Sequence, residues 1–137
     1  MSFISSKFPY SYKNSLNFGR VLDFKIWLKV ETIRGLKDLE FIFDTGADIS
    51  MLSFPWINET GNQVDELARC IMHCASNETM NVYKGFVKIK IGGNSELLNL
   101  PVVFSDRADT PILLGKLGLL DNISANLDHR RKILTLS

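Results

Sequence analysis

The chain has 137 residues, about the length of one domain. It is 45% hydrophobic and 23% charged, as soluble globular proteins are, and its net charge of +1 gives no overall attraction to nucleic acid. No segment approaches the roughly 20 apolar residues of a membrane-spanning helix, and the N-terminal residues lack the apolar core of a signal peptide. We therefore expect a cytoplasmic protein with no nucleic-acid partner and no membrane partner.

The first half of the chain predicts an arm followed by two strands. Residues 1–20 are polar with scattered aromatic side chains, so we expect a flexible arm or a loosely held first strand. Apolar and polar residues alternate over 21–30, which predicts one half-buried strand. After a turn over 31–38, a mostly apolar strand at 39–43 is expected to be buried on both faces. Residues 53–66 are polar and predict a loop or a short helix.

The second half predicts hairpins. Alternation marks a strand at 86–91, and the Gly-Gly-Asn sequence after it is a turn signal. The strand that returns over 97–104 contains Pro101, which indicates a sheet edge or a bulge. Many short strands at close spacing predict an all-β barrel or sandwich. The other expected elements are a hairpin of 67–72 and 79–83, one or two helical turns over 116–122, and a closing hairpin of 123–127 and 132–136.

An acid stands at the end of the apolar strand at 39–43. Residues 43–48 read Phe-Asp-Thr-Gly-Ala-Asp. Asp is depleted in strands, and a buried ionised carboxylate without partners costs several kcal/mol. Asp44 therefore either begins an ordinary turn, as Asp and Gly often do, or carries out chemistry. A second segment, Thr-Pro-Ile-Leu-Leu-Gly at 110–115, is also an apolar run, and it stops at a glycine.

Together the two segments resemble the retroviral-type aspartic proteases, the retropepsins. In that family an apolar strand leads into Asp-Thr-Gly-Ala, and a later apolar-apolar-Gly segment packs behind it. The resemblance covers roughly residues 21–137 and leaves 1–20 as a separate N-terminal arm. It implies an all-β fold: a retropepsin-like closed barrel with a flap hairpin and one short C-terminal helix.

The resemblance also implies an aspartic endopeptidase that uses neither a metal nor another cofactor. Peptide hydrolysis at such a site needs two carboxylates that share one proton. The chain offers only one suitable acid, because Asp109 and Thr110 are followed by Pro111, which has no N–H to donate to a carboxylate. A homodimer in which Asp44 of each copy meets at a two-fold axis supplies the second acid.

The family pattern gives roles to residues near Asp44. In the family, the Thr hydrogen-bonds across the dimer axis, and the Gly allows a tight turn. Asp48 corresponds to an acid that meets substrate backbone and an Arg, and Lys116 stands in the place of that Arg. The residues expected to support the site are Thr45, Gly46, Leu113, Leu114 and Gly115; those expected to contact a protein or peptide substrate are Ala47, Asp48, Met72, His73 and Cys74.

Departures from the family pattern keep other functions open. The flap tip, expected at 73–77, has no glycine, and Lys116 lacks the planar fork of Arg. The same fold without strong catalysis is a dimerisation or peptide-binding module. A processing enzyme with one dedicated protein substrate is a further alternative.

Three smaller features have competing interpretations. Cys70, His73 and Cys74 are soft metal ligands, but a structural zinc needs four ligands, so free thiols are favoured. The basic run at 129–132 favours a solvated turn over a nucleic-acid site, because no aromatic platform accompanies it. The aromatic-proline bond at 8–9 is of a kind that retroviral enzymes cut, which suggests self-trimming as a hypothesis.

Overall fold

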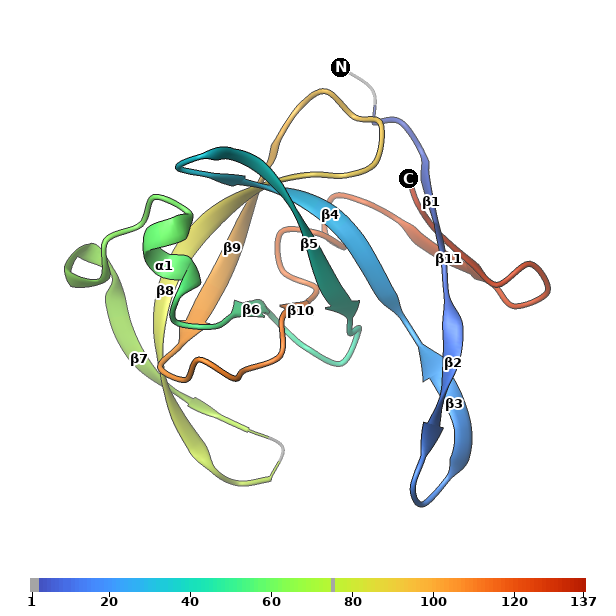
Figure 1. The fold of residues 1–137 in the computed structure, drawn as a ribbon, viewed down its shortest axis with the longest axis horizontal. Coiled ribbons are helices and arrows are strands. Elements are labelled where there is room, and N and C mark those ends of the chain that lie inside the picture. The colour runs from blue at the N-terminus through green and yellow to red at the C-terminus, as the bar shows by residue number, and fades with distance from the viewer. Residues whose placement is uncertain (1–2, 75) are drawn as a thin grey trace.

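A closed barrel of six strands forms the centre of the computed structural model, which describes residues 3–74 and 76–137 (Figure 1). Strands hold 52% of the residues and helices 5%, which confirms the all-β prediction. In order of pairing, the barrel strands are β4 (Lys25–Thr32), β5 (Gly35–Phe43), β10 (Leu113–Leu114), β6 (Ser50–Leu52), β9 (Leu98–Ser105) and β8 (Thr79–Lys90). β8 pairs with β4 and closes the barrel, while β7 (Ala68–His73) extends the sheet beyond β8 as the flap.

Alternation in β4 shows why this segment is a barrel strand. Ile26, Leu28 and Val30 are fully buried, while the residues between them are exposed. Each such aliphatic side chain contributes about 1.5–3 kcal/mol when it leaves water. The exposed face of β4 carries Trp27 between two lysines. The alternation of side chains along the strand therefore determines which residues line the core.

The single strand expected over 21–30 is in fact two strands. β3 (Gly19–Asp23) pairs with β2 (Ser11–Ser15) in a separate ribbon, and β4 begins at Lys25. The break falls at Phe24, whose carbonyl oxygen accepts a hydrogen bond of 2.8 Å from the N–H of Phe43. The alternation of apolar residues continues through the break, so it could not reveal it.

Much of the N-terminal arm is paired. β1 (Ser6–Pro9) pairs with β12 (Ile133–Leu136), which pairs with β11 (Ala125–Asp128) in a three-stranded sheet. Phe8 is buried in the core, so a protease must separate this strand before it can cut the bond at 8–9. Residues 1–2 of the expected arm lie outside the described residues.

The helices lie where the sequence suggested a loop or a short helix. They are α1 (Trp56–Glu59) and the 3-10 turn η1 (Val64–Glu66). The short C-terminal helix expected over 116–122 is corrected to a pair of hydrogen-bonded turns, because Gly118 has a positive φ of 78° that a regular helix does not allow. Among the described residues, no helix has the length and apolar character needed to cross a bilayer.

Pro101 lies where β9 has a single neighbour. β9 pairs with β8 along its whole length without a bulge, but β6 joins it only from Val102 onward. The proline is therefore at a local edge, as expected, although β9 as a whole is inside the sheet. β8 runs unbroken over Thr79–Lys90, where the sequence suggested two separate strands.

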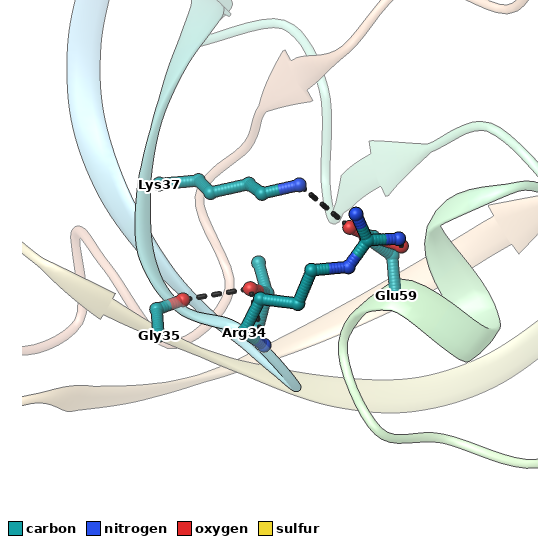
Figure 2. Close-up of polar contacts among 5 residues, drawn as sticks. Arg34, Gly35, Lys37 and Glu59 are labelled. Carbon is teal, nitrogen blue, oxygen red and sulfur yellow. Dashed lines mark hydrogen bonds and ion pairs between the residues drawn. The ribbon is translucent and has the colours of Figure 1, made fainter.

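Glu59 ties α1 to the turn between β4 and β5 (Figure 2). Its carboxylate lies 2.7 Å from Lys37 Nζ and 3.7 Å from Arg34 Nη2, and its carbonyl oxygen accepts a hydrogen bond from the N–H of Ile33. The hydrogen bond from Lys37 lowers the pKa of Glu59; its partial burial opposes this effect, and the charge of Arg34 adds to it.

We expect Glu59→Gln to lower the melting temperature slightly at neutral pH. A lowered folded-state pKa means that the ionised carboxylate stabilises the fold above the unfolded pKa of Glu, and that this contribution is lost as pH falls through the folded pKa. Wild type and variant should therefore converge in acid, which thermal unfolding at a series of pH values will measure. Glu96→Gln, at an exposed glutamate without an ion pair among the described residues, is the matched control. An equal deficit at every pH would contradict this account.

Candidate active site

Asp44 leaves the barrel directly after β5. Its N–H donates a 3.0 Å hydrogen bond to the carbonyl oxygen of Leu114, so the neighbouring strand β10 fixes the point where the chain turns out. The N–H of Ala47 donates to the carbonyl oxygen of Asp44 at 3.2 Å and closes the turn. Asp44 is half-buried, while Thr45 and Gly46 are exposed. The strand therefore delivers a carboxylate to the protein surface.

Gly46 fixes one oxygen of that carboxylate. Its N–H donates a 2.9 Å hydrogen bond to Asp44 Oδ1. A Cβ at this position would lie 3.2 Å from the same oxygen, tighter than ordinary contact, so glycine leaves the carboxylate room. Among the described residues, Asp44 Oδ2 accepts no hydrogen bond and is available to a water or a substrate.

The apolar segment at 113–114 lies directly behind this loop. β10 pairs in parallel with the end of β5, where Leu114 stands beside Phe43. On its other side β10 pairs antiparallel with β6, where Leu113 stands beside Met51. Leu114 is fully buried. The structure thus brings together the two segments that the sequence placed far apart.

Gly115 permits close backbone contact behind the site. A Cβ there would lie 2.5 Å from the carbonyl carbon of Ile49, and backbone atoms cannot move aside as a flexible side chain can. The N–H of Gly115 donates a 2.9 Å hydrogen bond to Ser50 Oγ, which is fully buried. Sequence reasoning missed Ser50, and its only signal was a hydroxyl within an otherwise apolar segment after the loop.

Lys116 extends the same junction. Its N–H donates to the carbonyl oxygen of Ala47 at 3.0 Å, and its Nζ lies 3.2 Å from Asp48 Oδ1. Lysine thus makes the ion pair that the family resemblance gave to arginine. The Asp48 side chain is 94% exposed, so this pair adds little stability and leaves the carboxylate accessible.

The flap forms a tight turn without glycine. The N–H of Cys74 donates a 2.9 Å hydrogen bond to the carbonyl oxygen of Glu78, and Asn77 takes a positive φ of 66°, which asparagine tolerates better than most residues. Residue 75, within the tip expected at 73–77, lies outside the described residues.

The inner face of the flap packs on an apolar cluster. Cys70 and Met72 are half-buried there, while His73 lies on the opposite, exposed face of β7. Of the three flap residues expected to meet substrate, Met72 is thus on the cluster side and His73 is not. The members of the cluster are Met51, Val82 and Val103, with Ile49, Cys70, Met72, Met80 and Leu113 packed against them.

The cysteines of the flap are free thiols. Cys70 and His73 lie on opposite faces of β7. Over residues 3–74 and 76–137, no group of three or more His, Cys, Asp or Glu side chains is placed to hold a metal ion. The geometry of the flap therefore gives no support to the zinc alternative.

The family model described as "Aspartyl protease" matches residues 31–117, which is more than half of the chain and includes both the Asp44 loop and Gly115. The chain belongs to the aspartyl protease family. Among solved structures, a retropepsin-like aspartic protease from Rickettsia conorii is similar, with a TM-score of 0.62 and 14% identity over 98% of this chain and 99% of the other. At that identity the likeness concerns the fold, and it confirms the retropepsin-like architecture of this chain. A comparison with curated protein sequences gave no significant match.

We expect Ser50→Ala to destabilise the protein by about 1–3 kcal/mol, because the buried N–H of Gly115 loses its acceptor. Ser11→Ala, which changes an exposed serine of β2, should alter stability far less. Urea denaturation of the two variants will measure the difference. Equal stability of both variants would show that Ser50 does not brace the Asp44 loop.

Proposed function

We propose that this aspartyl protease is an endopeptidase that acts as a homodimer, with one Asp44 from each copy forming the catalytic pair. The observation that carries the proposal is the Asp44 carboxylate, presented at the surface with one oxygen fixed by Gly46 and the other available. Each chain supplies one such acid. Asp109 lies in the exposed loop between β9 and β10 and is followed by Thr110 and a proline, so no glycine N–H stands in the corresponding position.

The surface around Thr45 supports the assembly of two copies. Exposed Thr45 lines a shallow hollow with residues 120–125, where β11 begins. Within the described chain, β11 is the last strand of its sheet, so its outer edge has no strand partner. Leu127 on β11 is also exposed. A second copy that pairs along this edge satisfies unpaired backbone groups and keeps both Thr45 residues near the two-fold axis.

The pair of Asp44 carboxylates accounts for hydrolysis without a covalent intermediate. One carboxylate is ionised and takes a proton from a water held between them, and that water attacks the scissile carbonyl carbon. The other carboxylic acid donates a hydrogen bond to the carbonyl oxygen as negative charge develops there. The tetrahedral intermediate then collapses, the C–N bond breaks, and the leaving amine takes a proton from the pair. The Gly46 N–H holds the ionised oxygen in place throughout.

The apolar cluster under the flap suggests the kind of peptide that binds. Met51, Met72, Met80 and Leu113 belong to it, and all but Met51 are only partly buried. Methionine adapts its shape to different apolar groups. We therefore infer a preference for apolar side chains next to the cut bond, with Asp48 exposed nearby to accept hydrogen bonds from peptide backbone.

We expect Asp44→Asn to lower kcat/KM by at least about a hundredfold, because it removes the acid–base group from both copies. Asp109→Asn makes the same charge change at an exposed site and should retain activity. A diverse peptide library, digested over a range of pH and read by mass spectrometry, will give the cut sites and a bell-shaped pH profile. Cleavage that survives Asp44→Asn would overturn the assignment. If wild type binds peptides but cuts none, the peptide-binding module is the better description.

Mixing of wild type with Asp44→Asn will test whether the site is shared. When subunits exchange freely, only dimers of two wild-type chains hold two carboxylates, so activity should follow the square of the wild-type fraction. Mixing with Asp109→Asn should leave activity nearly constant. A linear dependence in the Asp44→Asn mixture would show that each chain works alone.

A further inference from the structure

The β2–β3 ribbon projects away from the barrel (Figure 1). Its tip carries apolar side chains. Leu16 is 100% exposed and Phe18 is 82% exposed, and both lie in the turn that Gly19 closes with a positive φ. A single exposed apolar residue is ordinary, but here two large ones share the end of one ribbon. Neither belongs to the core of the described structure.

Cationic side chains lie on the same ribbon behind its tip, where Arg20 pairs with Asn14 and Lys13 pairs with Val21. Lys13 lies on β2, Arg20 lies on β3, and both are exposed. The guanidinium carbon of Arg20 lies 3.9 Å from the centre of the Tyr12 ring, and Lys132 Nζ lies 5.1 Å from it. Lys132 belongs to the turn between β11 and β12, so the two hairpins line one basic hollow.

The basic charge extends beyond that hollow. Arg130 and Arg131 stand beside Lys132 and are exposed. Two carboxylates lie nearby and pair with other cations: Asp128 Oδ2 lies 3.8 Å from Arg131 Nε, and Asp23 lies 3.5 Å from Lys25 Nζ. Among the described residues, Lys13, Arg20, Arg130 and Lys132 make no ion pair. In a chain of net charge +1, this corner therefore concentrates positive charge.

We propose that the β2–β3 ribbon docks this protein on a bilayer that contains anionic phospholipid. Leu16 and Phe18 enter the boundary between headgroups and acyl chains, while Lys13, Arg20 and Lys132 face the lipid phosphates. The Tyr12 ring lies at the level of the cations, as aromatic side chains do at membrane interfaces. The polar backbone groups of the turn stay among the headgroups, so insertion is shallow.

A bilayer fits this tip better than a protein partner does. Two side chains at the end of a narrow ribbon bury far less than the roughly 1,000 Å² that a specific protein interface needs. A bilayer can take up two apolar side chains without a surface of complementary shape, and its anionic headgroups match the excess of cations on the ribbon. The sequence predicted no membrane partner because no segment spans a bilayer, but peripheral docking needs no spanning segment.

Co-sedimentation with vesicles tests the proposal. Wild type should bind vesicles of equal parts phosphatidylcholine and phosphatidylglycerol, bind phosphatidylcholine alone at least tenfold more weakly, and dissociate as salt is added. The double variant Leu16→Ser, Phe18→Ser should lose at least tenfold in bound fraction. Its control is Ile33→Ser, Leu36→Ser, which removes two exposed apolar side chains at the turn between β4 and β5.

Charge reversal supplies the second arm of the test. Lys13→Glu, Arg20→Glu should abolish binding, whereas Lys84→Glu, Lys88→Glu on β8 makes the same net change elsewhere and should retain it. Melting temperatures will confirm that each variant folds. The proposal is overturned if wild type does not bind the anionic vesicles, or if the tip variants bind as wild type does. A second copy is the better assignment for the tip if wild type does not bind vesicles and sedimentation velocity shows that the tip variant no longer forms dimers. Peptide cleavage is not a readout here, so the outcome is independent of the proposed catalysis.

Discussion

The insertion of β10 between β5 and β6 is the constraint on which the Asp44 loop depends. β10 has only two residues, so few strand-pairing hydrogen bonds hold it. Burial of Leu114 and the hydrogen bond from the N–H of Gly115 to Ser50 Oγ further fix its position. The backbone at Gly115 lies so close to that of Ile49 that no side chain fits. The carbonyl oxygen of Leu114 in β10 accepts a hydrogen bond from the N–H of Asp44. Any change that moves β10 therefore also moves the Asp44 carboxylate. The position of the Asp44 carboxylate thus depends on a segment far along the chain.

Patterns of burial predicted much of the fold, but they do not record which strand pairs with which. The alternation in β4, the flap hairpin and the closing hairpin were all visible in the sequence. The break at Phe24 was not, because its apolar side chain keeps the period of two, while β3 before it pairs with β2 and β4 after it pairs with β5. A strand within the N-terminal arm was one of two alternatives, but its partner was not predictable, because the pairing of β1 with β12 joins the two ends of the chain.

The residues of the candidate site could be named where the family pattern fixes residue types, and not where their support comes from backbone geometry. Asp44, Gly46 and Gly115 can be recognised in the sequence by residue type alone. Ser50 cannot, because its role depends on the fold, which brings its hydroxyl to the buried N–H of Gly115. The flap tip departs from the family pattern because the sequence has no glycine there. Asn77 supplies the left-handed conformation instead, so the turn is still tight and the departure lies in the side chains at the tip.

A site divided between two chains links catalysis to concentration. If each chain contributes one carboxylate, activity per chain depends on the fraction of chains that are paired, and the exposed ion pair between Asp48 and Lys116 does little to rigidify the junction next to the loop. Docking through Leu16 and Phe18 would confine the chains to a surface layer and raise their effective concentration there. A bilayer could then increase proteolysis without touching Asp44, simply by favouring the encounter that completes the site.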